Sequence, residues 1–328
     1  MHGETVTTNV KKSVRKKKDL RQKVKRYFLA ANAKSVENQR LKKIAAKVPV
    51  AIKPAASAFV ANVAGAVSTI CIPFTMALSS TQRWRYNQLY IAERIRITDE
   101  EFGAKKAEAE ARSRAEKRIA DEVKSKDAIE KLGLALCDFL LHMHSNPEVV
   151  EASAELLRQG AVLIWGALET LARDIFESTI NAKPLLAKRV LDSPECRKLF
   201  QIKAIDFDTL AKFNFDVSGR IGSILVQLHD LSNLPAIKVI FGALSPSSSK
   251  LRSALSSKNL WILNQRRHLI VHNRSIVDQR YIENTGERLR LGQKLLLEPK
   301  DLLGYISLVQ EVGAEILETT NNIWKTST

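Results

Sequence analysis

Residues 149–180 read VVEASAELLRQGAVLIWGALETLARDIFESTI, and this stretch decides the fold. Apolar side chains recur in it at the spacing of an α-helix, at Leu157, Ala161, Ile164, Leu168, Leu171 and Ile175. Because residues three and four apart share one side of a helix, the pattern predicts a long helix with one buried face. Such a face has to be covered by other elements, so the pattern favours a helical bundle.

The sequence around this helix predicts further helices at residues 207–213, 221–241, 257–273 and 300–324. Apolar residues make up 45% of the chain and aromatic residues only 6%, a balance that suits helix packing better than a β-sandwich. One short exception is expected. Asn284-Thr285-Gly286, followed by LRLGQKLLL, predicts a turn and a β-hairpin between the helices at 257–273 and 300–324. The predicted fold class is all-α, with a helical domain over residues 132–328 and a helical N-terminal extension.

The net charge of +17 is concentrated near the N-terminus. Residues 1–53 contain 16 Lys and Arg against three acidic residues. Clustered positive charge binds polyanions, so RNA, DNA or an anionic membrane surface is the expected partner of this basic arm. The arm is too charged to bury, and we expect it to be disordered or loosely helical.

Residues 54–82 carry no charge and are long enough to cross a bilayer as a helix. Much of this apolarity comes from Ala, however, and Pro73 should bend or end a helix. Two interpretations stay open: a membrane span that attaches an otherwise cytoplasmic protein, or a helical hairpin packed on protein.

Residues 83–131 are rich in Ala, Glu, Lys and Arg and predict a solvated, charged helix, with Thr98 and Glu101 at capping-box spacing. The three cysteines lie far apart and show no metal or redox spacing. We expect them to be buried thiols in a reducing compartment.

Residues 260–281, LWILNQRRHLIVHNRSIVDQRY, contain the polar groups most suited to chemistry. On a helix Arg267 falls in the middle of an apolar stripe formed by Leu260, Leu263, Ile270 and Val271. A guanidinium keeps its charge, so in that place it must pair with a carboxylate or face an anion. His268 and His272 lie four residues apart on a neighbouring face.

Arg267, the polar His268, three apolar residues and His272 resemble the signature of the HEPN family, in which a His comes five positions after an Arg. RRHLIVHNRSIVDQRY followed by ENTGERLRLG is similar to the motif region of HEPN proteins of the RiboL-PSP type. The helix that carries Trp165, Glu169 and Arg173 resembles their earlier core helix. The resemblance covers residues 132–324 and does not reach the basic arm or the apolar segment.

The resemblance implies a helical bundle that dimerises, so that two motifs face one cleft, and that cuts RNA without a metal or cofactor. His272 would serve as general base or acid and Arg267 would stabilise the phosphoryl oxygens. The implied products are a 2′,3′-cyclic phosphate and a 5′-hydroxyl. The resemblance further implies a toxin or defence role with an antitoxin or defence partner.

Four residues are predicted to support the pair. His268 is expected to orient the substrate, Asn273 to fix a tautomer or cap the helix end, and Glu169 to reach Arg267 and orient it. Arg266 is either part of the site or an ordinary surface residue. The alternative function is a non-catalytic HEPN module that binds RNA, a nucleotide or a partner protein.

Overall fold

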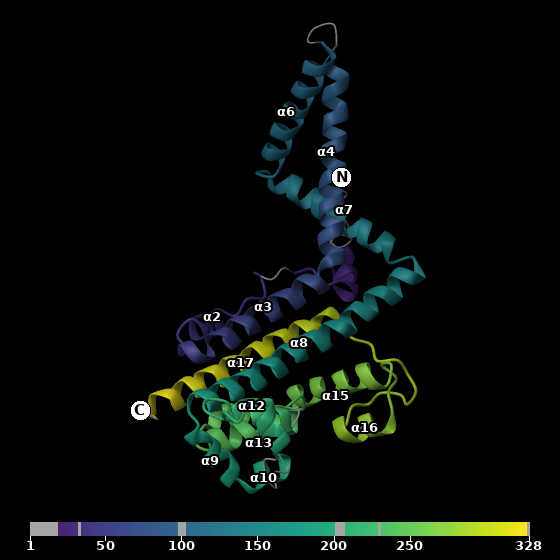
Figure 1. The fold of residues 1–328 in the computed structure, drawn as a ribbon. Helices are drawn as coiled ribbons and strands as arrows, with labels where there is room; N and C mark the ends of the chain where they lie inside the picture. Colours follow the sequence, from purple (N-terminus) through teal and green to yellow (C-terminus); the bar gives the residue numbers. More distant parts are fainter. Residues whose placement is uncertain (1–18, 32–33, 98–102, 201–206, 229–230, 327–328) are drawn as a thin grey trace, which may run out of the picture. The chain divides into compact units, whose positions relative to one another are not determined.

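The computed structural model describes residues 19–31, 34–97, 103–200, 207–228 and 231–326, and these residues form an all-α protein (Figure 1). The helices are α2 (Gln39–Ala45), the 3-10 helix η1 (Val50–Ile52), α3 (Lys53–Ile70), α4 (Ile72–Arg96), α6 (Ala104–Glu122), α7 (Lys126–Met143), α8 (Pro147–Ala182), α9 (Leu185–Asp192), α10 (Pro194–Phe200), α11 (Phe207–Lys212), α12 (Ile221–Leu228), α13 (Leu234–Leu244), α14 (Ser249–Leu255), α15 (Lys258–His272), α16 (Gln279–Thr285) and α17 (Pro299–Thr326).

Four of the predicted helices occur as α8, α11, α15 and α17, within a few residues of the expected bounds. The helix predicted over residues 221–241 is instead two helices, α12 and α13. Asn233 caps the second of these, because its side chain accepts a hydrogen bond from the Ala236 amide, and a proline follows in the first turn.

The predicted β-hairpin is wrong: the described residues contain no strand. Asn284 and Thr285 end α16, and Gly286 closes it in the left-handed conformation, at a φ of 67°. The chain that follows runs antiparallel to residues 275–277 through one isolated bridge, between Ile276 and Lys294. Its alternating pattern therefore supports a single extended segment laid beside a turn.

The chain folds into two compact units, each assembled from separated pieces of sequence. Unit 1 comprises Met1–Ala30, Ile70–Glu155 and Glu298–Lys300, and unit 2 comprises Ala31–Thr69, Leu156–Leu297 and Asp301–Thr328. The domain predicted over residues 132–328 therefore differs from the unit observed. Residues 31–69 belong with the C-terminal helices, and residues 132–155 do not.

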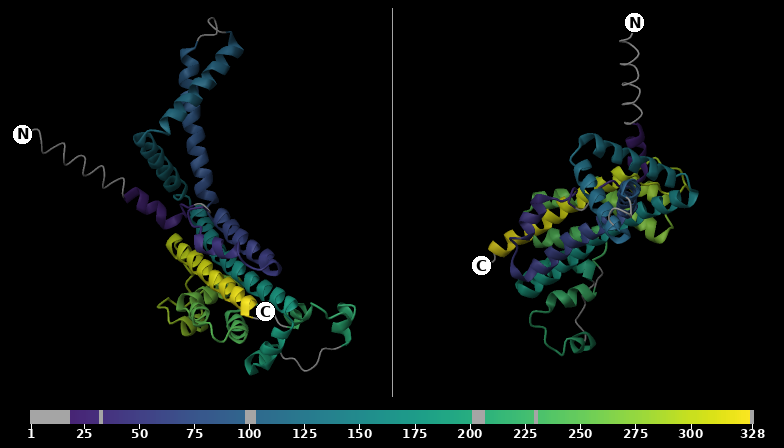
Figure 2. Two further views of the ribbon diagram at one scale, coloured as in Figure 1. Left: turned by 90° about the vertical axis from the view of Figure 1, so that its left-hand side faces the viewer. Right: turned by 90° about the horizontal axis from the view of Figure 1, so that it is seen from above.

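The core of unit 2 lies between α3, α8 and α17, which run side by side (Figures 1 and 2). Phe59 of α3 is fully buried against Gly313 of α17, close to Leu171 of α8. A Cβ atom at Gly313 would overlap the Phe59 ring. The glycine is thus what lets α3 approach α17 this closely.

Part of the basic arm, which is expected to be disordered or loosely helical, is ordered in unit 2 and includes the helix α2. Leu41 of α2 and Ile52 of η1 are buried. Arg40 reaches three carboxylates of α17: Glu311 at 3.1 Å, Glu315 at 2.6 Å and Glu318. One arginine between three acids holds α2 on α17, so some of the arm's charge is neutralised within the protein. Six of the arm's other fifteen lysines and arginines lie in residues 1–18, outside the described residues.

The apolar segment 54–82 is not one helix. It breaks at Cys71 between α3 and α4, where Pro73 lies in the first turn of α4, as its effect on a helix predicts. Residues 50–70 are long and apolar enough to cross a membrane; Phe59, Val63 and Val67 of this segment are buried in unit 2, whereas Val50 is exposed. The exposed side of α3 carries Ser57, Asn62 and Ser68.

Unit 1 contains a long helical hairpin of α4 and α6, joined to α7 (Figure 1). The region predicted as one charged helix, residues 83–131, is divided among these three helices. Three alanines of α6, Ala107, Ala111 and Ala115, have no exposed surface, and the first two pack in a cluster with Ile97 and Tyr90. Thr98 and Glu101 lie outside the described residues. At the base of the unit, Val24 and Phe28 pack with Ala77 and Leu140.

Candidate functional site

The candidate site lies at the end of α15 in unit 2, where the helix stops abruptly. His272 is its last residue, and Arg274 and Ser275 follow with positive φ angles of 50° and 65°. Two such residues outside glycine are uncommon and turn the chain sharply. Leu260, Leu263 and Ile270 are buried as predicted, whereas Val271 is exposed.

Arg267 pairs with Glu169, which α8 contributes. The Arg267 Nη2 atom lies 3.6 Å from Glu169 Oε1, a distance that makes an ion pair and exceeds a hydrogen bond. The Arg267 side chain keeps 24% of its exposure and the Glu169 side chain 16%. The expected reach of Glu169 to Arg267 is present, and it leaves part of the guanidinium accessible to an anion.

His268 and His272 face each other on the exposed side of α15. Their ring centroids are 4.6 Å apart, with the planes tilted by 45°. Desolvation lowers the pKa of His268, and the nearby charges of His272, Arg280 and Arg267 lower it further. The lowered pKa favours the neutral form of His268, and a neutral imidazole can accept a proton.

No hydrogen bond or ion pair between described residues joins Arg267 directly to His272. The helix splays the two side chains, as its geometry predicts. Arg267 faces α8, while His272 faces outward at the helix end. Within one chain they line one end of α15 and do not form a contacting pair.

Arg266 is neither a surface residue nor an open site residue. It donates hydrogen bonds to the Tyr281 hydroxyl at 3.2 Å, the Tyr305 hydroxyl at 2.7 Å and Glu287 Oε1 at 2.7 Å. The Tyr281 hydroxyl in turn donates to Glu287. Burial raises the pKa of Tyr305 to about 12, so its hydroxyl stays protonated at ordinary pH. We call these four side chains the Arg266 network; it ties α15 to α16 and α17.

The Arg266 network could not be seen in the sequence. Its other members come from α16, from the segment after it and from α17, at no regular spacing from Arg266. The only available signal was the pair of adjacent arginines on a helix with one apolar stripe, which does not show what Arg266 contacts.

Asn273 caps the helix end, one of its two predicted roles. Its side-chain amide donates to the Ile276 carbonyl at 2.7 Å and to Asp278 Oδ2 at 3.3 Å. Asp278 also caps α16 by accepting a hydrogen bond from the Tyr281 amide at 2.7 Å. These bonds fix the turn that ends α15 directly after His272.

The segments that follow the histidine pair in the sequence carry five exposed cations: Arg274, Arg280, Arg288, Arg290 and Lys294. Exposed apolar side chains accompany them, including Val271 at 48% and Leu296 at 69% of full exposure. A basic surface attracts phosphates, and exposed apolar residues beside it are suited to a protein contact.

No family model, curated protein or solved structure matches the chain. The resemblance to the HEPN family therefore rests on the residues quoted above.

Proposed function

We propose that the protein is an endoribonuclease of HEPN type that cuts RNA at the end of α15 without a metal. The observation that carries the proposal is the arrangement of this helix end. A guanidinium held by Glu169 and an exposed imidazole pair lie on the same short helix, with cations in the segments that follow. This arrangement offers both a proton acceptor and a fixed positive charge for a phosphate.

In the proposed reaction the ribose 2′ oxygen attacks the adjacent phosphorus as His272 takes its proton. The bond from phosphorus to the 5′ oxygen breaks, and the leaving oxygen gains a proton from the protonated His272 of a second copy. Arg267 stabilises the negative charge that builds on the phosphoryl oxygens. The products are a 2′,3′-cyclic phosphate and a 5′-hydroxyl, and DNA is not cut because it lacks the 2′-hydroxyl.

A second copy of the chain would complete the cleft. Arg267 and His272 diverge within one chain, so two copies of α15 placed end to end can bring the arginine of one to the histidine of the other. The exposed Val271, directly before His272, and the exposed Leu296 support a contact at this place.

The test is end-group analysis of a defined RNA incubated with the full chain in EDTA. Cyclic phosphate ends are expected from the wild type, and His272→Ala and Arg267→Ala should each reduce cutting at least a hundredfold. An RNA with one 2′-deoxy nucleotide should stay intact at that position. His142→Ala and Arg114→Ala are matched controls far along the chain, and they should cut normally.

A non-catalytic RNA-binding module is the second candidate, and the separation of Arg267 from His272 favours it. Binding without cleavage by a folded dimer would establish this second function. Cleavage that survives both substitutions would place the chemistry elsewhere.

A further inference from the structure

A narrow apolar stripe runs along the exposed side of α4 in unit 1. Trp84, Ile91 and Ile95 are 58%, 55% and 78% exposed, although large apolar residues are normally buried. With the exposed Gln88, they are spaced four, three and four residues apart, which is the spacing of a coiled-coil seam. On the helix the four side chains fall within about 60° of one another. We call these four residues the α4 stripe.

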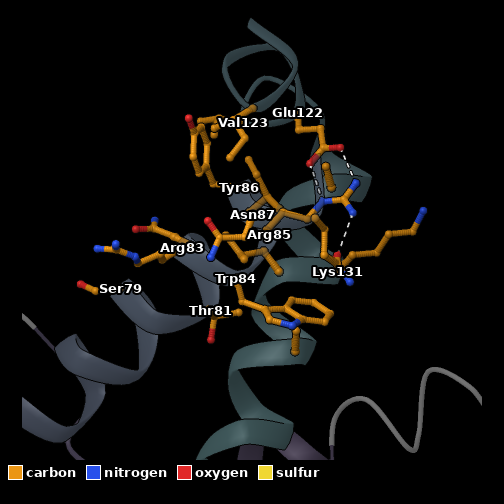
Figure 3. A pocket seen from close by; sticks show the side chains of 17 residues that line it. Ser79, Thr81, Arg83, Trp84, Arg85, Tyr86, Asn87, Glu122, Val123 and Lys131 are labelled. Carbon is orange, nitrogen blue, oxygen red and sulfur yellow. Dashed lines mark hydrogen bonds and ion pairs between the residues drawn. The ribbon is translucent and has the colours of Figure 1, made fainter. Parts of the chain in front are cut away.

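The α4 stripe borders a groove between α4, α6 and α7. The groove has a volume of about 1010 Å³. Figure 3 shows Arg83, Trp84 and Arg85 of α4 among the residues that line this groove, together with Val123, which directly follows α6, and Lys131 of α7. Val123 and Ile129 add exposed apolar surface of 60% and 54%. The groove can therefore receive bulky side chains that project from a helix lying on the stripe.

The width of the α4 stripe favours a helix as its occupant. An amphipathic helix that lies in a membrane surface needs a broad apolar face. A stripe as narrow as about 60° instead fits a contact with one partner helix. Gln88 lies inside the seam, where a polar residue sets the register of paired helices at some cost in affinity.

Charge selects the kind of helix. Arg83 and Arg94 flank the α4 stripe on one side, and Arg85 and Arg96 on the other. The one acid of α4, Glu93, is buried on the opposite side and pairs with Arg118 of α6 at 2.5 Å and with Arg96 at 3.2 Å. Glu122 at the groove likewise pairs with Arg85, which lowers the pKa of that carboxyl.

The exposed face of α4 therefore carries apolar residues and four flanking arginines; two of these, Arg85 and Arg96, pair with Glu122 and Glu93, and no acidic residue of α4 faces outward. A second copy of the same stripe would bring arginines against arginines, which disfavours self-association through it. We propose that the α4 stripe is a docking surface for an acidic amphipathic helix of a partner protein. Its apolar residues lie on Trp84, Ile91 and Ile95, and its acidic residues meet the flanking arginines.

The test uses the full chain and a fluorescent 18-residue helical peptide with Leu at the a and d positions and Glu at the e and g positions. We expect the peptide to bind at about micromolar concentration, at least tenfold more tightly than the same peptide with Lys in place of Glu. The double variant Ile91→Ala, Ile95→Ala should weaken binding at least tenfold, and Trp84→Ala should do the same.

Leu185→Ala is the matched control, because Leu185 is an exposed aliphatic residue on α9, in unit 2. It should bind the peptide like the wild type, and thermal melts followed by circular dichroism should show all variants folded. Equal binding of the acidic and basic peptides, or binding that survives the stripe substitutions, overturns the proposal.

Two further arms separate the rival occupants. If the double variant abolishes self-association in sedimentation experiments, the occupant is a second copy. If it abolishes co-sedimentation with phosphatidylcholine vesicles containing phosphatidylserine, the occupant is a membrane. Either result rejects the partner helix.

Discussion

Two adjacent arginines on α15 have opposite surroundings. Arg267 keeps a partly open guanidinium beside Glu169, as the apolar stripe around it predicts. Arg266 is more deeply buried and is surrounded by Tyr281, Tyr305 and Glu287. Helical periodicity predicted that Arg267 needs a counter-charge, because it places this arginine among apolar residues of the same helix. The surroundings of Arg266 depend on where α16 and α17 fold, which no local pattern specifies.

Replacing Arg266 with alanine should destabilise the protein by about 3 kcal/mol, because Glu287 would remain largely buried without its cation. Urea unfolding of the full chain measures this loss. Arg288→Ala, at the exposed arginine beside Glu287, should change the free energy of unfolding by less than about 0.5 kcal/mol. Equal effects of the two substitutions would mean that the Arg266 network does not stabilise the fold.

The imidazole pair makes a prediction about titration. Desolvation and the charges of His272, Arg280 and Arg267 lower the pKa of His268, so its NMR signals should titrate below 6.5. His272→Ala removes one of those charges and should move the His268 midpoint upward. Because the folded state disfavours protonated His268, lowering the pH below the ordinary histidine pKa should destabilise the wild type. The His268→Gln variant should lose less stability over the same pH range. A His268 midpoint at or above 6.5 would contradict this reading.

At the scale of elements, periodicity predicted α8, α11, α15 and α17 of unit 2, but it missed α9, α10, α14 and α16 and did not show how the helices end or pair. The apolar face of α8 was legible because it is long and regular. The alternating LRLGQKLLL segment looked like a hairpin because alternation marks an extended chain without naming its partner, which here is the turn after α15. The membrane interpretation of α3 had the same weakness: an apolar helix can be covered by protein or by lipid.

Close packing of α3 on α17 makes Gly313 sensitive and Gly304 tolerant. Gly313→Ala should destabilise the protein by about 1–3 kcal/mol, because the added methyl group overlaps the Phe59 ring in a filled core. Gly304→Ala meets nothing within 4 Å on the same helix and should be neutral or stabilising by up to about 1 kcal/mol. Thermal unfolding of both variants measures these changes. A Gly313→Ala variant as stable as the wild type would show that α3 does not pack closely on α17 at Gly313.

The whole molecule is two units whose chain segments alternate. Unit 2 takes α2 and α3 from the N-terminal part of the sequence and its remaining helices from the C-terminal part. Residues 70–155, which separate these parts in the sequence, belong to unit 1. A change in residue composition near position 132 suggested a domain boundary, but composition cannot show that residues 31–69 complete a distant core. That contact is set by Phe59, Gly313 and Leu171, which are far apart in the sequence.

A fragment of residues 132–328 should therefore fold poorly, because removing α3 uncovers the apolar surface around Leu171 and Gly313. We expect it to aggregate or to melt well below the full chain in calorimetry. Co-expression of residues 1–131 as a separate chain should restore a soluble complex. A fragment as stable as the full chain would show that α3 is dispensable for the core.

The alternation of segments also sets an order of events during synthesis. α3 leaves the ribosome long before α17, so the seat of Phe59 on Gly313 does not exist while unit 1 is being made. Until then α3 presents a bare apolar face, which a chaperone can hold or a neighbouring nascent chain can capture. The end of α15 can become rigid only after α17 brings Tyr305 to Arg266. A nascent chain that ends before α17 therefore contains Arg267 and His272 but lacks the complete Arg266 network.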